Sequence, residues 1–300
     1  MKKKTYLFAL MAMALTLGSC SDNENGIGGE TSKYITVSTS IGNMTRVATD
    51  ANGGQTFEEG DEISVYAWTG APTVAPETSE RVVNNAINKL TNGTWVSTPQ
   101  MLWKNNRDKH YFIGVYPTAA ISDLSAGEYI FDVNKQTESD LLVAVNKDGI
   151  SYNADEQQTV PLTFTHVMAK LAVNLTYKNQ WGGIPTVEKV VVGNAAKEAT
   201  INYLTKVVTP STTAKEDFSL PEITENTKYV SVIIPQEDVK QLTIVIGGKN
   251  FVYDNGTPFK LESGKITTVN LEVGRDEIKL GDVKITNWED GSTFSGEALN

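Results

Sequence analysis

The sequence has little of the side-chain chemistry on which enzymes and metal proteins depend. Its 300 residues include one cysteine and two histidines. His110 and His166 are far apart in the chain, whereas a zinc site gathers several cysteine or histidine ligands. We therefore expect no metal, no cofactor and no catalytic residue. We expect His110, in a charged loop, to be solvated, and His166, in an apolar stretch, to be packed and hydrogen-bonded.

Positive charge is also in deficit. The chain has 26 Lys and Arg against 36 Asp and Glu, so its formal net charge is −10. A surface of this sign repels the phosphate backbone of nucleic acids. We therefore exclude nucleic acid as a partner.

Long apolar runs are absent too, and the clearest short one lies at the N-terminus. It extends from Leu7 to Leu17 after a head of three lysines. A membrane-spanning helix needs about 20 such residues, so this run is too short for one. A basic head, a short apolar run and the small residues Gly18-Ser19 are typical of a secretory signal peptide. We predict a signal peptide over residues 1–19.

The only cysteine, Cys20, follows this signal directly and has no disulfide partner. Its position resembles a bacterial lipobox, in which the thiol is lipidated and becomes the mature N-terminus. Several acyl chains would anchor the protein firmly to the outer membrane. The alternative is an ordinary cleaved signal followed by a chance cysteine. We predict an exported, lipid-anchored precursor with a polar tether after Cys20.

The remaining pattern is β almost throughout. Short runs that alternate between apolar and polar residues recur between Gly, Asn, Asp and Pro, as in Ile63–Trp68 and Leu242–Ile246. Many short strands at this spacing favour an all-β fold of β-sandwiches. The stretch Ser79–Leu90 is the exception, for which a short helix is expected. Asn92-Gly93, Asp148-Gly149 and Asn255-Gly256 predict tight hairpins.

The length favours two domains. The polar stretch Tyr152–Thr159 precedes a new strand pattern at Val160, and so the boundary is placed near residue 157. We predict an N-terminal sandwich over residues 47–157 and a C-terminal one over residues 158–275.

A series of short motifs follows in a characteristic order. They are Thr45-Arg46, Phe57–Trp68, Gly93–Trp95, Met101–Trp103, Tyr111–Pro117, Asp140–Ala144, Val160–Leu171 and Ile285–Trp288. Together they resemble the fimbrillin family, the type V pilins and related lipoproteins of Gram-negative anaerobes. One departure is Lys104, where the family pattern has proline.

The resemblance implies two tandem transthyretin-like β-sandwiches and a route of assembly. A precursor is exported as a lipoprotein, a trypsin-like surface protease cleaves after an arginine, and the subunits polymerise by strand exchange. The implied partners are other pilin subunits, that protease and the outer membrane.

The N-terminal part of the chain fits this route. Residues 20–46 would form a tether and a removable strand, in which Ile35, Val37 and Ile41 alternate with polar residues. Cleavage between Arg46 and Val47 would detach this strand. The alternative is that Arg46 is an ordinary arginine in an exposed loop.

The C-terminal tail, residues 276–300, supplies a candidate donor strand. Ile278, Leu280, Val283 and Ile285 give it a strand-like pattern beyond the last expected domain strand. Insertion into a neighbouring subunit would be β-strand addition. The alternative is that the tail is simply the final strand of the second domain.

We therefore predict a structural, non-enzymatic subunit of a cell-surface pilus. The alternative function is a surface glycan-binding lipoprotein, which would expose aromatic side chains on one face. The five tryptophans could form such a platform, although their strand-like surroundings favour core packing.

Overall fold

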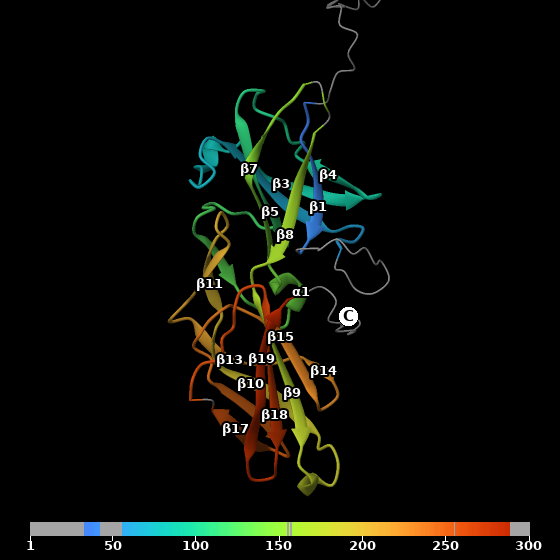
Figure 1. Ribbon diagram of the computed structural model, residues 1–300, viewed down its shortest axis with the longest axis vertical. Helices are drawn as coiled ribbons and strands as arrows, with labels where there is room; N and C mark the ends of the chain where they lie inside the picture. Colours follow the sequence, from blue (N-terminus) through green and yellow to red (C-terminus); the bar gives the residue numbers. More distant parts are fainter. Residues whose placement is uncertain (1–32, 43–55, 155, 157, 255, 289–300) are drawn as a thin grey trace, which may run out of the picture. The chain divides into compact units, whose positions relative to one another are not determined.

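The computed structural model describes residues 33–42, 56–154, 156, 158–254 and 256–288. The described residues belong to one compact unit. Nearly all of its regular structure is β, as expected from the alternating pattern (Figure 1). Among the described residues, no helix is long and apolar enough to cross a membrane.

The first sheet has seven strands in the order β1-β8-β7-β5-β2-β3-β4. They are β1 (Thr36–Ile41), β8 (Thr159–His166), β7 (Leu142–Ser151), β5 (Lys109–Tyr116), β2 (Glu62–Thr69), β3 (Val83–Thr91) and β4 (Thr94–Thr98). Strand β1 is at one edge and runs parallel to β8, whereas the other pairs are antiparallel.

Three further sheets contain the other strands. The five-stranded sheet contains β14 (Glu222–Thr224), β15 (Lys228–Ile233), β9 (Ala169–Tyr177), β18 (Lys265–Val273) and β19 (Ile278–Asn287), in that order. The four-stranded sheet contains β13 (Lys215–Ser219), β10 (Val187–Ala196), β16 (Gln241–Ile246) and β17 (Lys249–Asp254). The three-stranded sheet contains β12 (Val207–Pro210), β11 (Glu198–Asn202) and β6 (Gly127–Ile130). The helical segments are η1 (Thr78–Glu80), α1 (Gln136–Ser139) and η2 (Asn179–Trp181).

Two clusters of buried apolar side chains hold these sheets together. The smaller one lies under the seven-stranded sheet and includes residues of β1, β2, β5 and β8. The larger one includes most inward side chains of the later strands. The hydrophobic effect of burying these two clusters is the main stabilising term for the fold.

The strand β8 begins just after the boundary placed near residue 157, yet it belongs to the seven-stranded sheet. It pairs with β1 and β7, whereas the next strand, β9, pairs with β15 and β18. The change of sheet therefore falls between His166 and Ala169. The division into two domains remains a prediction.

The helix expected over Ser79–Leu90 is wrong. Most of this stretch is strand β3, between β2 and β4. The register shifts within β3 where Asn85 has a φ of 56°. An inserted residue of this kind spaces Val83 and Ala86 three positions apart, which imitates the periodicity of a helix.

One of the three predicted hairpins is confirmed. Asn92-Gly93 joins β3 to β4, and both residues have positive φ. The hairpin at Asp148-Gly149 is wrong, because both residues lie within strand β7, which pairs with β5 on either side of them. The hairpin at Asn255-Gly256 is wrong, because the segment after it pairs elsewhere: Leu261 bridges to Gln236, and Phe259 donates its N–H to Val239. Pro258, which lacks an N–H, is unsuited to pairing back onto β17.

Candidate functional site: the first and last strands

The first strand, β1, fills a gap at the edge of the seven-stranded sheet. The side chains of Ile35, Val37 and Ile41 are only 3, 6 and 7% exposed. They pack in the same apolar cluster as Trp95, Met101, Trp103, Leu162 and Phe164. The residues proposed from sequence as a removable strand are thus part of a core.

Backbone hydrogen bonds join β1 to two sides of this gap. Strand β1 lies beside β8 (Figure 1), and its register runs from Thr36 opposite Thr159 to Ile41 opposite Phe164. On the other side, Ile35 donates its N–H to the Met101 carbonyl at 3.0 Å, and Trp103 donates to the Lys33 carbonyl at 3.2 Å. Removing β1 would leave unpaired backbone groups on both sides.

Thr39 is the polar position on the inward face of β1; the sequence pattern places it on the same face as its apolar neighbours but gives it no role. The indole Nε1–H of Trp95, in β4, donates a hydrogen bond to the Thr39 hydroxyl at 3.0 Å. Trp95 is 9% exposed, and its ring lies edge-on to Phe57 at 5.3 Å. The sequence indicates this inward position, because Thr39 lies at an even spacing from Ile35, Val37 and Ile41 and alternate residues of a strand point to the same face.

The last strand, β19, contains all four candidate donor residues, and they share one face. The inward residues of β18 are Val273, Leu271, Val269 and Thr267, all at most 1% exposed. They lie opposite Ile278, Leu280, Val283 and Ile285, respectively. Strand β19 therefore turns its apolar residues toward the core side of the sheet.

A bulge at Gly281 makes this common face possible. Asn270 lies opposite Asp282 and Leu271 opposite Leu280, so Gly281 has no partner in the register. The extra residue brings Leu280 and Val283, three apart in the chain, to the same face. A Cβ at this glycine would lie 3.2 Å from the Asn270 carbonyl oxygen, so the close approach favours glycine.

The apolar face of β19 is incompletely covered. Leu280, Val283 and Ile285 are 38, 39 and 37% exposed, although they continue an otherwise buried row. β19 is also the edge strand of its sheet, and such edges offer backbone groups to another chain. The structure therefore places the tail as the final strand of its sheet and leaves it partly exposed.

Trp288, directly after β19, is buried. Its indole stacks on the His166 imidazole, and the ammonium of Lys170 lies 4.0 Å from the centre of its ring. His166 Nδ1 is 2.8 Å from the Asp140 carboxylate. The backbone N–H of Trp288 donates a hydrogen bond to the Gly264 carbonyl at 2.9 Å. The expectation that His166 is packed and hydrogen-bonded is confirmed.

The expectation that His110 is solvated is wrong, because its side chain is completely buried. Its Nδ1–H donates to the Asp108 carbonyl at 3.1 Å, and Nε2 accepts from the Lys104 N–H at 3.1 Å. Burial lowers the pKa of His110 and so favours its neutral form. Both ring nitrogens are hydrogen-bonded to backbone groups, so His110 has a structural role.

Potential metal ligands and tryptophans are the two features of the described residues that bear on the other chemistries considered. Among these residues, no group of three or more His, Cys, Asp or Glu could hold a metal ion. Four tryptophans, at positions 68, 95, 103 and 288, are at most 9% exposed. The fifth, Trp181, is half-buried, and its indole N–H donates a hydrogen bond to the Val273 carbonyl.

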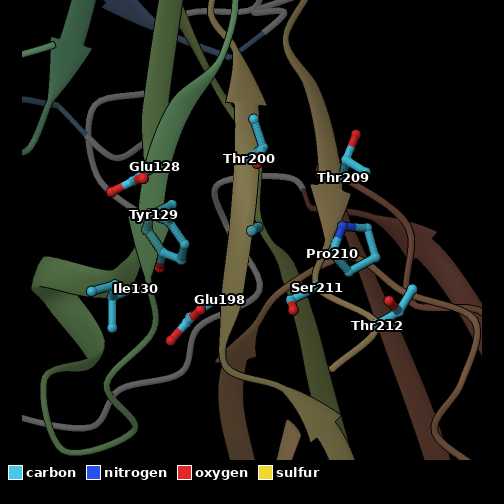
Figure 2. Close-up of a pocket in the computed structure, with 10 residues that line it drawn as sticks. Glu128, Tyr129, Ile130, Glu198, Thr200, Thr209, Pro210, Ser211 and Thr212 are labelled. Carbon is cyan, nitrogen blue, oxygen red and sulfur yellow. The ribbon is translucent and has the colours of Figure 1, made fainter. Parts of the chain in front are cut away.

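An open pocket of about 600 Å³ lies on the three-stranded sheet (Figure 2). Glu128 and Glu198 contribute carboxylates to its lining, and Thr200, Thr209 and Ser211 contribute hydroxyls. Its aromatic residue, Tyr129, donates its hydroxyl to the Ser139 carbonyl. Tyr129 is the one aromatic residue among those that line the pocket, whereas the glycan-binding alternative calls for several exposed aromatic side chains on one face.

Three residues singled out from the sequence lie outside the described residues. They are Cys20, the predicted lipidation site, and Arg46 and Val47, the predicted cleavage site. The predicted signal peptide lies there too. These assignments remain predictions.

Comparison with known proteins agrees with this architecture. A sequence model described as fimbrillin-like matches residues 45–288. No curated protein matches the chain significantly.

Several solved structures resemble the chain, among them three crystal structures of proteins from Bacteroides species. A candidate cell adhesion protein from Bacteroides ovatus has a TM-score of 0.62 and 17% identity, over 85% of this chain and 98% of that one. One from Bacteroides uniformis has a TM-score of 0.60 and 18% identity, over 86% and 100%. A fimbrial protein from Bacteroides vulgatus has a TM-score of 0.51 and 13% identity, over 84% and 99%. At these identities the likeness concerns the fold.

Proposed function

Because the chain belongs to the fimbrillin-like family, we propose that it is a structural, non-catalytic subunit of a cell-surface pilus. The observation that carries the proposal is the placement of β1. This first strand lies at a sheet edge, and its side chains fill a core. A chain cut after Arg46 would have no covalent bond to hold β1 in place.

The proposed route begins with export as a lipoprotein. Acyl chains on Cys20 hold the folded precursor at the outer membrane, facing the cell exterior. A trypsin-like surface protease then cleaves between Arg46 and Val47. Cleavage separates the lipid and β1 from the rest of the subunit, so that the assembled pilin retains neither.

Departure of β1 would leave a groove lined by apolar side chains and unpaired backbone groups. The vacated positions of Ile35, Val37 and Ile41 adjoin Trp95, Trp103 and Phe164. Exposed edges and apolar surface of this kind favour insertion of another strand. A second copy is the proposed donor, through its strand β19.

Insertion of this tail into the next subunit is a head-to-tail contact. Such a contact does not close on itself, and so repetition builds a filament. The exposed apolar row on β19 would then become buried in the neighbour's groove. The partners are thus other subunits of the pilus, with no nucleic acid and no cofactor.

Limited trypsin treatment of the chain from Ser21 onward tests this proposal. We expect a cut after Arg46, followed by concentration-dependent, detergent-resistant ladders on a gel. Arg46→Ala should abolish the ladders, whereas Arg107→Ala, at an exposed loop arginine, should not.

Two results would contradict parts of the proposal. Equal polymerisation of the Arg46→Ala protein would exclude the cleavage step. Ladder formation after deletion of residues 276–300 would exclude the tail as donor.

A further inference from the structure

The hydrogen bond between Trp95 and Thr39 distinguishes one position in the groove from the others. Three inward positions of β1 hold apolar side chains, and the Thr39 position holds the acceptor for a tryptophan N–H. If β1 leaves, this N–H remains beside Phe57 without its partner. An unsatisfied donor in apolar surroundings is unfavourable. The strand that replaces β1 is therefore favoured if it brings an acceptor to the same position.

We propose that Trp95 determines the register of the incoming strand, and that Asn287 of a second copy supplies the acceptor. This inference rests on the strand exchange proposed above and adds the alignment of the two chains. Trp95 acts as a specificity-determining residue for subunit joining.

The sequence of the tail supports this register. Residues Ile35–Thr39, which are the residue before β1 and its first four residues, alternate as apolar, polar, apolar, polar and acceptor. Residues Val283–Asn287 repeat this order, with Val283, Ile285 and Asn287 matching Ile35, Val37 and Thr39. Thr286, like Ser38, is the small hydroxyl residue before the acceptor.

Two other alignments within residues 274–288 place two apolar residues before an acceptor. In the first, residues Ile278–Asp282 run in the same direction as β1. In the second, the tail runs in the opposite direction, from Leu280 through Ile278 to Asp276. Each sets an aspartate against Trp95. Burying a carboxylate is more unfavourable than burying a neutral amide.

The last inward position, that of Ile41, receives a charged residue in both registers that run in the direction of β1, namely Glu289 in the proposed one and Lys284 in the Ile278–Asp282 one. The two registers therefore differ chiefly at Trp95, where only Asn287 provides a neutral acceptor.

The register requires Trp288 to leave its position in the free subunit. Trp288 would take the place of Ser40, which is exposed on the outer side of β1. Its stacking on His166 would be lost, and β19 would separate from β18. Trp288 thus has to be released before its own tail can be donated.

Cysteine pairs test the register directly. Thr36 lies opposite Thr159 of β8, so Lys284 of an incoming tail would lie opposite Thr159 in the proposed register. In the Ile278–Asp282 register, Lys279 would take that place. We compare T159C with K284C, and T159C with K279C, in the trypsin-treated chain from Ser21 onward. This chain lacks Cys20, the only native cysteine.

A second measurement isolates the hydrogen bond. Asn287 is exposed in the free subunit, so Asn287→Leu should leave the subunit folded. We expect it to slow ladder growth about tenfold, from the loss of one buried hydrogen bond. Thr286→Val is the matched control on the opposite face. In a Trp95→Phe background, which keeps an aromatic ring without the N–H, Asn287→Leu should have little effect.

The outcomes separate this inference from the proposal beneath it. Intermolecular disulfides through K284C but not K279C, with the Asn287 effect lost in Trp95→Phe, support the register. Cross-linking through K279C, or ladders that cross-link through neither residue, overturns the register and leaves strand exchange standing. Absence of ladders in the parent chain overturns strand exchange, and the register with it.

Discussion

The indole ring of Trp288 stacks on the imidazole ring of His166, with 3.9 Å between the ring centroids and 6° between the planes. Trp288 is 8% exposed, whereas the residues of β19 before it are mostly exposed. His166 ends β8, the strand that also pairs with β1. The same strand therefore contacts both the segment proposed to leave and the segment proposed to be donated.

Trp288→Ala should loosen the last strand. Loss of a buried tryptophan side chain destabilises by about 3 kcal/mol or more. Because Trp288 closes only the end of β19, we expect faster amide hydrogen exchange in the β18–β19 pair before global unfolding. Ile184→Ala, at a 64% exposed side chain, serves as the control. Unchanged protection of β19 would show that the stacking does not hold the strand.

Thr39→Val should destabilise the uncleaved chain by about 1–3 kcal/mol, because the Trp95 N–H would lose its acceptor in a buried site. Thr39→Ser keeps the hydroxyl and should retain most of the stability. Urea unfolding measures the difference. Equal midpoints for the valine and serine variants would mean that this hydrogen bond contributes nothing.

Gly114→Ala should destabilise the seven-stranded sheet. A Cβ on Gly114, in β5, would lie 2.6 Å from the ring of Phe164, which is completely buried. Overpacking of this kind costs about 1–3 kcal/mol. The matched substitution Gly193→Ala meets nothing closer than 3.4 Å and should have a smaller effect. Comparable losses in thermal unfolding would argue against the close contact.

Stability should fall as the pH drops below the ordinary pKa of histidine, about 6.5, in part because of His110. Burial lowers its pKa in the folded state, so the unfolded chain binds a proton that the folded chain does not. This contribution is fully favourable above pH 6.5 and is lost as the pH falls toward the lowered value. His110→Asn should therefore lose less free energy of unfolding than the parent between pH 7.5 and 5.5. An equal loss would exclude His110 as a contributor.

The local alternation of apolar and polar residues predicted the strands in which that two-residue period is unbroken. The alternation in residues 34–41 predicted β1. The four apolar residues of the tail share one face only because the bulge at Gly281 offsets the break in their alternation. The pattern failed where long-range pairing overrode the local spacing. Val83 and Ala86 imitate a helix because a bulge separates them, and His110 is buried although its neighbours in sequence are charged.

The sequence by itself determined the all-β class and the family, because alternation and motif order are properties of the chain. It also supplies the predictions for Cys20 and Arg46, which lie outside the described residues. Only the tertiary structure decided that β8 accompanies β1, that Trp95 meets Thr39, and that Trp288 rests on His166. Residues 56 and 122 positions apart meet in these last two contacts. Contacts between such distant residues depend on how the strands pair and pack, which a local pattern does not encode.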